Sequence, residues 1–320
     1  MTIGWLFFNT DFDGHDAQKV FAAGWPLLPM AIVVPYLAFV YWVPHWMKNR
    51  PPFDVRVVAR VWNIALAVFS ICGAFVCVPH LAEQLYRHGF WYCACADVYE
   101  LAGYGAPALW AAAFSWSKLF ELFDTVLLIL KKRPVRTLHW FHHASVVVFV
   151  WATWAYENPL ALWFGAMNYT VHSVMYSYFA LTSSNRWRAA ALRIAPAITL
   201  LQISQFAMGT ILNGFATVAF FTPDVGCATK PAILQLSGLM YLLYGGMFMQ
   251  LFVNRYVTGT KPGRASAQRS AAQERCGAAQ YSSAALHARA TDADDAEDEW
   301  PSTRPLLHES SHDAGALKNV

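Results

Sequence analysis

Long apolar windows separated by short polar segments occupy most of the chain. Seven of these windows are long enough to be membrane-spanning helices, and they cover residues 25–46, 61–79, 107–130, 137–156, 159–181, 189–212 and 233–252. A helix needs about 20 mostly apolar residues to cross the hydrocarbon core of a bilayer, and each window approaches that length. The pattern therefore predicts an all-α integral membrane protein with seven transmembrane helices.

The composition agrees with this prediction. Of the 320 residues, 57% are hydrophobic and only 13% are charged, against roughly 25% charged residues in a soluble domain. The net charge of +3 is too small to indicate a nucleic-acid partner. We expect three parts: an N-terminal segment at 1–24 that lacks the basic region of a signal peptide, a membrane domain at 25–257, and a polar, disordered tail at 258–320.

Basic residues predict the orientation of the helices in the membrane. Lys and Arg are retained on the cytosolic side of membrane proteins. The loops after the first, third and fifth windows are basic, whereas the other loops carry at most one basic residue. We therefore expect the N-terminus outside the cytosol and the C-terminus inside it. The basic residues of these loops are Lys48, Arg50, Arg56, Arg60, Lys131, Lys132, Arg133, Arg136, Arg186 and Arg188.

Polar side chains inside the apolar windows are concentrated in the third to sixth windows. Side chains three or four residues apart share a helix face, so those of each window can form one stripe. Because such groups are costly in hydrocarbon, each stripe should face the interior of the bundle. This predicts a polar pocket in the cytosolic half of helices three to six. The residues are Lys118, Glu121, Asp124, His139, His142, His143, Asn168, His172, Tyr176, Tyr178, Gln202 and Gln205.

The histidine-rich stretch LHWFHH at 138–143 allows more than one chemistry. Membrane desaturases and hydroxylases hold two irons with similar boxes, but they need several boxes, and here only His172 joins the triplet inside the membrane. A neutral imidazole is also a base and a nucleophile, and no cysteine lies between Ala96 and Gly226 to supply a thiolate. We expect acyl transfer through histidine and no metal. A metal-dependent desaturase or hydroxylase and a non-enzymatic receptor or transporter are the alternatives.

Four segments together resemble the motifs of one family. KLFELFDT at 118–125, LHWFHH at 138–143, MNYTVHSVMYSYF at 167–179 and TLLQISQ at 199–205 resemble, in order and spacing, KxxExxDT, LHxxHH, NxxxHxxMYxYY and TxxQxxQ. These are motifs of the ELO family of fatty-acid elongases. The resemblance covers roughly residues 25–255, and its one visible departure is Phe179 in place of the last tyrosine of the third motif.

The resemblance implies a reaction in the endoplasmic reticulum membrane, with the N-terminus in the lumen. A long-chain acyl-CoA and malonyl-CoA, the two substrates, would condense to 3-oxoacyl-CoA, CO2 and CoA without a bound cofactor. His142 would form an acyl-imidazole, and His139, His143, His172 and Asn168 would assist it. The motifs look closest to the branch that elongates saturated and monounsaturated chains. The substrate-binding residues would be Lys118, Glu121, Asp124, Tyr176, Tyr178, Gln202, Gln205, Lys131, Lys132 and Arg136.

Other partners follow from the same resemblance. They are membrane lipid, a second copy of the chain in a homodimer, and three functionally coupled enzymes: a ketoacyl-CoA reductase, a hydroxyacyl-CoA dehydratase and an enoyl-CoA reductase.

Purely structural roles stay open for some of the polar residues. Lys118 and Glu121 can equally be a packing ion pair, and Gln205 an interhelical hydrogen bond.

The cysteines divide between compartments. Cys93, Cys95 and Cys227 are expected in loops on the non-cytosolic side, where disulfides persist. A bridge from Cys227 to either Cys93 or Cys95 would tie the loop before the third helix to the loop before the seventh. Cys276 belongs to the expected cytosolic tail.

Overall fold

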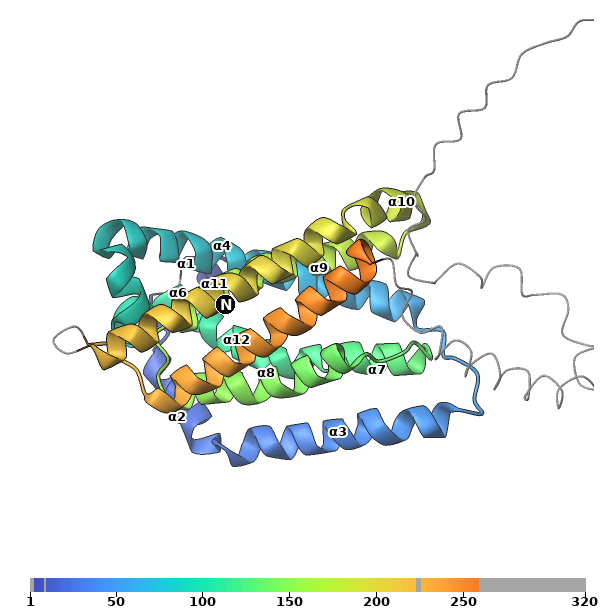
Figure 1. The fold of residues 1–320 in the computed structure, drawn as a ribbon, viewed down its shortest axis with the longest axis horizontal. Helices are drawn as coiled ribbons and strands as arrows, with labels where there is room; N and C mark the ends of the chain where they lie inside the picture. Colours follow the sequence, from blue (N-terminus) through green and yellow to red (C-terminus); the bar gives the residue numbers. More distant parts are fainter. Residues whose placement is uncertain (1–2, 9, 223–225, 259–320) are drawn as a thin grey trace, which may run out of the picture. The chain divides into compact units, whose positions relative to one another are not determined.

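The computed structural model describes residues 3–8, 10–222 and 226–258, which fold almost entirely into helices (Figure 1). The tail expected at 258–320, with Cys276, lies outside the described residues except for Thr258. The helices are α1 (Ile3–Phe8), α2 (Gly14–Gly24), α3 (Leu27–Met47), α4 (Arg56–Cys95), α5 (Val98–Ala102), α6 (Gly105–Glu121), α7 (Phe123–Leu130), α8 (Thr137–Ala155), α9 (Ala161–Thr182), α10 (Asn185–Arg193), α11 (Ala195–Phe221) and α12 (Pro231–Phe252), followed by a π-helical turn η1 (Val253–Val257).

Four helical stretches in the described part of the chain are long and apolar enough to cross a membrane. They are α3, α4, α11 and the stretch Pro231–Val257, which contains α12. The windows at 107–130, 137–156 and 159–181 are also helical, as α6 with α7, α8 and α9. These helices are less apolar or shorter: α8 and α9 carry the histidines and other polar residues, and α6 ends at Glu121. The chain is therefore a helical, multi-pass membrane protein.

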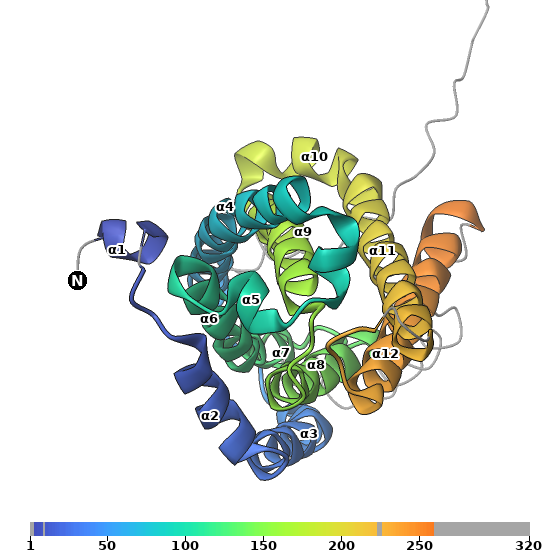
Figure 2. The ribbon, with the colours of Figure 1, turned by 90° about the vertical axis from the view of Figure 1, so that its left-hand side faces the viewer.

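α9 lies inside the bundle, where it packs against α4, α6 and α11 (Figure 2). Its closest approach is to α4: a Cβ atom built on Gly73 of α4 would lie 2.4 Å from the ring of Tyr169. Only glycine leaves room for that ring. α2 and α3 lie at the periphery, where both contact α8. The polar stripe of α9 is thus presented to neighbouring helices and not to lipid.

The bounds of the second and sixth windows differ from those of the helices in the structure. α4 extends from Arg56 to Cys95, well beyond the window at 61–79, with Pro79 inside it and a break at Gly89, where φ is 80°. Hydropathy marks the part suited to lipid, whereas the residues after Pro79 include good helix formers and continue the helix. Cys93 and Cys95, which we expected in a loop, therefore lie in the last turn of α4. The window at 189–212 is divided between α10 and α11.

Candidate functional site

A buried ion pair lies where α6 meets α9. Lys118 Nζ donates to Glu121 Oε1 at 2.7 Å and to Asn168 Oδ1 at 3.0 Å. Ser117 Oγ also donates to Glu121 Oε1, at 3.1 Å, and His172 Nδ1 lies 3.7 Å from the same oxygen. The side chains of Lys118 and Glu121 are only 4% and 5% exposed. Two opposite charges are thus held away from solvent, with every partner supplied by α6 or α9.

Asp124 occupies the next position along the same contact. Its two carboxylate oxygens accept hydrogen bonds of 2.7 Å from Trp62 Nε1 on α4 and from the hydroxyl of Tyr176 on α9. The ring of Tyr176 packs edge-on against that of His172, with 5.3 Å between centroids. Asn168, His172 and Tyr176 are spaced by four and therefore share one face of α9. This face meets the charged residues of α6 and α7 in succession.

The three histidines of α8 form a second cluster. The ring centroids of His139 and His143 are 4.5 Å apart, and those of His142 and His143 are 5.7 Å apart. Tyr244 of α12 packs edge-on against His142 at 4.8 Å, and its hydroxyl hydrogen-bonds Ser145. His142 Nδ1 is buried and has no hydrogen-bond partner among the described residues.

His139 is held by a hydroxyl group from α7. Its Nε2 lies 3.0 Å from Thr125 Oγ1, and Thr125 Oγ1 lies 2.8 Å from the hydroxyl of Tyr36 on α3. Asp124, which accepts from Trp62 and Tyr176, therefore does not orient His139. Its neighbour Thr125 does so.

The ion pair and the histidine cluster belong to one electrostatic environment. The charge on Lys118 acts on both His142 and His143, and so does the charge that His172 would carry if protonated. The structure thus brings together residues of α6, α7, α8 and α9 that are far apart in the chain. Such a cluster supplies a nucleophile or base, a cation, a carboxylate and an amide within one buried region.

Three of the expected substrate-binding residues on α9 and α11 have other neighbours. Gln202 Nε2 donates to Met175 Sδ at 3.4 Å. Gln205 is buried on α11, and its interhelical hydrogen bond stays a prediction. Tyr178 packs against α10 and α11, in a hydrophobic cluster with Ala191, Ala195 and Ile198.

The basic residues expected to bind substrate lie on the connection between α7 and α8. Lys132 is exposed, and its Nζ donates to the carbonyl of Lys48 at 3.1 Å. Arg136, which is exposed, precedes α8, and desolvation of its guanidinium together with the nearby guanidinium of Arg255 lowers its pKa. Two guanidinium groups that repel one another favour a bound anion between them.

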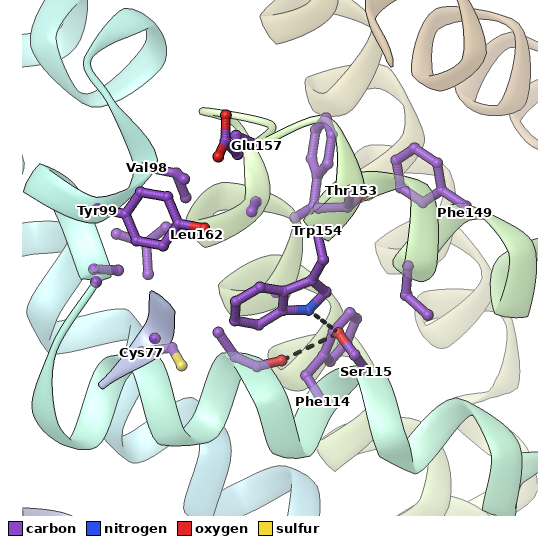
Figure 3. A pocket seen from close by; sticks show the side chains of 18 of the residues that line it. Cys77, Val98, Tyr99, Phe114, Ser115, Phe149, Thr153, Trp154, Glu157 and Leu162 are labelled. Carbon is purple, nitrogen blue, oxygen red and sulfur yellow. Dashed lines mark hydrogen bonds between the residues drawn. The ribbon is translucent and has the colours of Figure 1, made fainter. Parts of the chain in front are cut away.

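A cavity of about 70 Å³ lies at the other end of α8 (Figure 3). Its lining combines the aromatic side chains of Phe114, Phe149 and Phe164 with polar groups of Tyr99, Thr153 and Glu157. In Figure 3 the indole of Trp154 donates to Ser115 Oγ across this region, at 2.8 Å. The sequence predicted a pocket beside the histidines, and that pocket stays a prediction.

No three His, Cys, Asp or Glu side chains in the described ranges are grouped so that they could hold a metal ion. The carboxylates near the histidines are engaged elsewhere: Glu121 accepts from Lys118 and Ser117, and Asp124 from Trp62 and Tyr176. The geometry therefore gives the metal-dependent alternative no support.

A disulfide joins the end of α4 to the connection between α11 and α12. Of the two pairings expected for Cys227, the structure contains the one with Cys95, with 4.4 Å between the Cα atoms. Cys93 is a buried free thiol. The bridge lies at the same end of the bundle as the cavity, because Val98, which lines the cavity, follows Cys95 closely in the chain.

Several residues of the site were not predicted from the sequence. Trp62 and Tyr36 come from α4 and α3, and Tyr244 comes from α12, none of which was expected to contribute. Aromatic residues are ordinary in membrane helices, so these three carried no signal. Thr125 and Ser117 could have been found from the sequence, because Thr125 ends the motif KLFELFDT and Ser117 directly precedes it.

Comparison with known proteins gives matches over most of the chain. The model of the family described as "ELO: GNS1/SUR4 family" matches residues 21–264. Very long chain fatty acid elongase 4 of Trypanosoma cruzi (strain CL Brener) is 37% identical over 258 residues, which cover 80% of this chain and 89% of the relative. Very long chain fatty acid elongase 6 of Drosophila melanogaster is 33% identical over 270 residues, covering 83% and 82%. Long chain fatty acid elongase 2 of Caenorhabditis elegans is 34% identical over 244 residues, covering 75% and 87%.

Proposed function

Because the chain belongs to the ELO family and is thus an enzyme of fatty acid elongation, we propose that it catalyses the condensing step. It joins a long-chain saturated or monounsaturated acyl-CoA to malonyl-CoA and releases 3-oxoacyl-CoA, CO2 and CoA. The observation that carries this proposal is the cluster of His139, His142 and His143 on α8, in which His142 experiences the charges of the buried Lys118–Glu121 pair. It supports acyl transfer without a metal or a bound cofactor.

In the first half-reaction, His142 attacks the carbonyl carbon of the acyl thioester. A bond forms between an imidazole nitrogen and the acyl carbon, the carbon–sulfur bond breaks, and the CoA thiolate leaves with the imidazole proton. His142 suits this role because its Nδ1 has no hydrogen-bond partner among the described residues. The edge-on ring of Tyr244 limits how far His142 can turn.

In the second half-reaction, malonyl-CoA loses CO2, and the resulting enolate carbon attacks the acyl-imidazole. The bond to His142 then breaks, and uptake of one proton regenerates the neutral imidazole. His172 and Asn168 border the site beside Glu121 and Lys118, so they stabilise the enolate oxygen or assist the return of a proton to His142. Lys118 contributes its positive charge from within the ion pair.

The orientation proposed from the basic loops gives this chemistry access to CoA. Seven spans in the endoplasmic reticulum membrane, with a lumenal N-terminus and a cytosolic C-terminus, place Lys131, Lys132 and Arg136 at the cytosolic surface, where CoA phosphates would bind. The acyl chain then extends along α8 toward the cavity. The eight helical steps from His142 to Val150 correspond to about 12 Å along the helix axis, a distance that suits a long aliphatic chain.

The product defines the neighbouring reactions. A 3-oxoacyl-CoA becomes a longer saturated acyl-CoA through ketone reduction, dehydration and enoyl reduction, which the condensing enzyme does not perform. We therefore propose functional coupling to a ketoacyl-CoA reductase, a hydroxyacyl-CoA dehydratase and an enoyl-CoA reductase, within a lipid membrane and as a homodimer.

The test is a condensation assay with the full chain purified into phospholipid nanodiscs. Palmitoyl-CoA and isotopically labelled malonyl-CoA are supplied together or separately, and 3-oxoacyl-CoA is measured by mass spectrometry. We expect product only with both substrates, and none from His142→Ala. His45→Ala is the matched control, because His45 is an exposed histidine on α3.

Two results would contradict the proposal. One is the absence of condensation product with every saturated and monounsaturated acyl-CoA from lauroyl to behenoyl. The other is an unsaturated or hydroxylated product made without malonyl-CoA, which would favour the metal-dependent alternative.

A further inference from the structure

A line of hydrogen bonds connects the peripheral helix α3 to the histidine cluster. The hydroxyl of Tyr36 on α3 lies 2.8 Å from Thr125 Oγ1, and Thr125 Oγ1 lies 3.0 Å from His139 Nε2 on α8. Tyr36 is 7% exposed and Thr125 is fully buried. The line therefore runs through protein interior, where water does not replace a missing partner.

The number of hydroxyl and imidazole hydrogens determines which group donates and which accepts in each hydrogen bond of this line. Tyr36 and Thr125 each have one hydroxyl hydrogen, and a neutral imidazole has one N–H. Thr125 is the hydrogen-bond partner that the described residues offer to the Tyr36 hydroxyl. If Tyr36 donates to Thr125, then Thr125 donates to His139 Nε2, and every hydroxyl hydrogen in the line is used.

The reverse direction leaves a buried donor without an acceptor. If Nε2 of His139 carried the proton, it would donate to Thr125, and Thr125 would donate to Tyr36. The hydroxyl hydrogen of Tyr36 would then have no acceptor among the described residues. An unsatisfied buried donor is costly enough to favour the first direction by about tenfold or more.

We propose that Tyr36 is a positioning residue, which acts through Thr125 to hold His139 in the neutral tautomer with its proton on Nδ1. His139 then serves the condensation as a hydrogen-bond donor toward the reacting carbonyl, and not as its base. This inference rests on the proposed function, because it assigns a role within the same reaction.

The surroundings of His139 are consistent with this role. The aromatic side chain nearest to it in the cluster is His143, one turn further along α8. The groups that face His139 from other elements are Thr125 on α7 and, behind it, Tyr36 on α3. None of these is a carboxylate that would stabilise an imidazolium. α3 packs against α7 and α8, so this line is a direct polar connection between α3 and the site.

The test is nitrogen NMR of the full chain labelled at histidine with ¹⁵N, because the two neutral tautomers differ in which ring nitrogen carries the proton. His139→Gln identifies the signal. We expect His139 to be protonated on Nδ1 in the unmodified protein. In Tyr36→Phe we expect a substantial population protonated on Nε2, since the phenol no longer orients Thr125.

Kinetics provides a second measurement on the same variants. In Tyr36→Phe, kcat for condensation falls by about twofold, because loss of the roughly tenfold bias lowers the fraction of His139 protonated on Nδ1 from about nine-tenths toward one-half, while KM for acyl-CoA stays unchanged. Thr125→Val, which removes the hydroxyl at nearly constant shape, has an equal or larger effect. Thr125→Ser, which keeps the hydroxyl, retains the tautomer and most of the activity.

Tyr41→Phe is the matched control, because Tyr41 lies on the same helix and is 67% exposed. It leaves both the tautomer and kcat unchanged. The proposal is overturned if His139 carries its proton on Nε2 in the unmodified protein, or if Tyr36→Phe lowers activity without changing the tautomer. The second result would assign Tyr36 to packing alone. A failure of the proposed function is distinguishable, because the unmodified protein would then form no malonyl-dependent product whatever the tautomer.

Discussion

Breaking the Lys118–Glu121 pair should destabilise the protein strongly. Glu121→Gln removes the negative charge but keeps the shape, which leaves Lys118 buried with Asn168 and a neutral amide as partners. At 2.7 Å and an effective dielectric constant of about 20, the gross attraction is about 6 kcal/mol. A lysine of ordinary pKa can instead release its proton at pH 7 for about 4.6 kcal/mol, which limits the penalty. We expect the free energy of unfolding to fall by about 3–5 kcal/mol.

The double variant Lys118→Met with Glu121→Gln should recover most of this loss, because neither charge then remains buried. Unfolding is followed by SDS titration in mixed micelles for both single variants and the double variant. Glu83→Gln is the control: Glu83 pairs with Arg87 at 2.6 Å, but the two side chains are 50% and 63% exposed, so the loss should stay below about 1 kcal/mol. Single variants within 1 kcal/mol of the unmodified protein, or effects that simply add in the double variant, would show that the two charges do not stabilise one another.

Three further predictions concern packing, the disulfide and the cavity. Gly209→Ala should lower the free energy of unfolding by about 1–3 kcal/mol, since its Cβ would lie 2.0 Å from the ring of Tyr241. Gly214→Ala is the control, because open space surrounds Gly214. Equal shifts of the melting temperature in the two variants would contradict this prediction. Cys95→Ser removes the disulfide between residues 132 positions apart and should lower the free energy of unfolding by up to roughly 5 kcal/mol. Reductant should lower the melting temperature of the unmodified protein but not that of this variant. Phe149→Ala enlarges the cavity and should shift elongation toward longer products, whereas Phe221→Ala, on an exposed residue, should leave the product length unchanged.

Spacing was the most informative feature of the sequence. Asn168, His172 and Tyr176 follow one another at intervals of four, so a single face of α9 was expected to carry them. The structure places this face against Lys118, Glu121 and Asp124. The helical membrane class and the ELO family were likewise predicted, and both are confirmed.

The remaining features depend on tertiary contacts that local patterns do not encode. Tyr36 and Trp62 look like other aromatic residues of membrane helices until α3 and α4 are placed beside α7. The extension of α4 to Cys95 lies in a region too polar for a hydropathy window to include. The cavity beyond Phe149 arises where α5, α6, α8 and α9 meet, so no single segment indicates it.

The most direct test of the histidine mechanism is to look for the acyl-enzyme itself. The purified protein is incubated with palmitoyl-CoA alone, and its intact mass and proteolytic peptides are analysed. We expect the mass of one palmitoyl group on His142, absent in His142→Ala, retained in His45→Ala and discharged by malonyl-CoA. Turnover that requires both substrates at once, with no adduct on His142, would contradict the acyl-imidazole and indicate direct condensation.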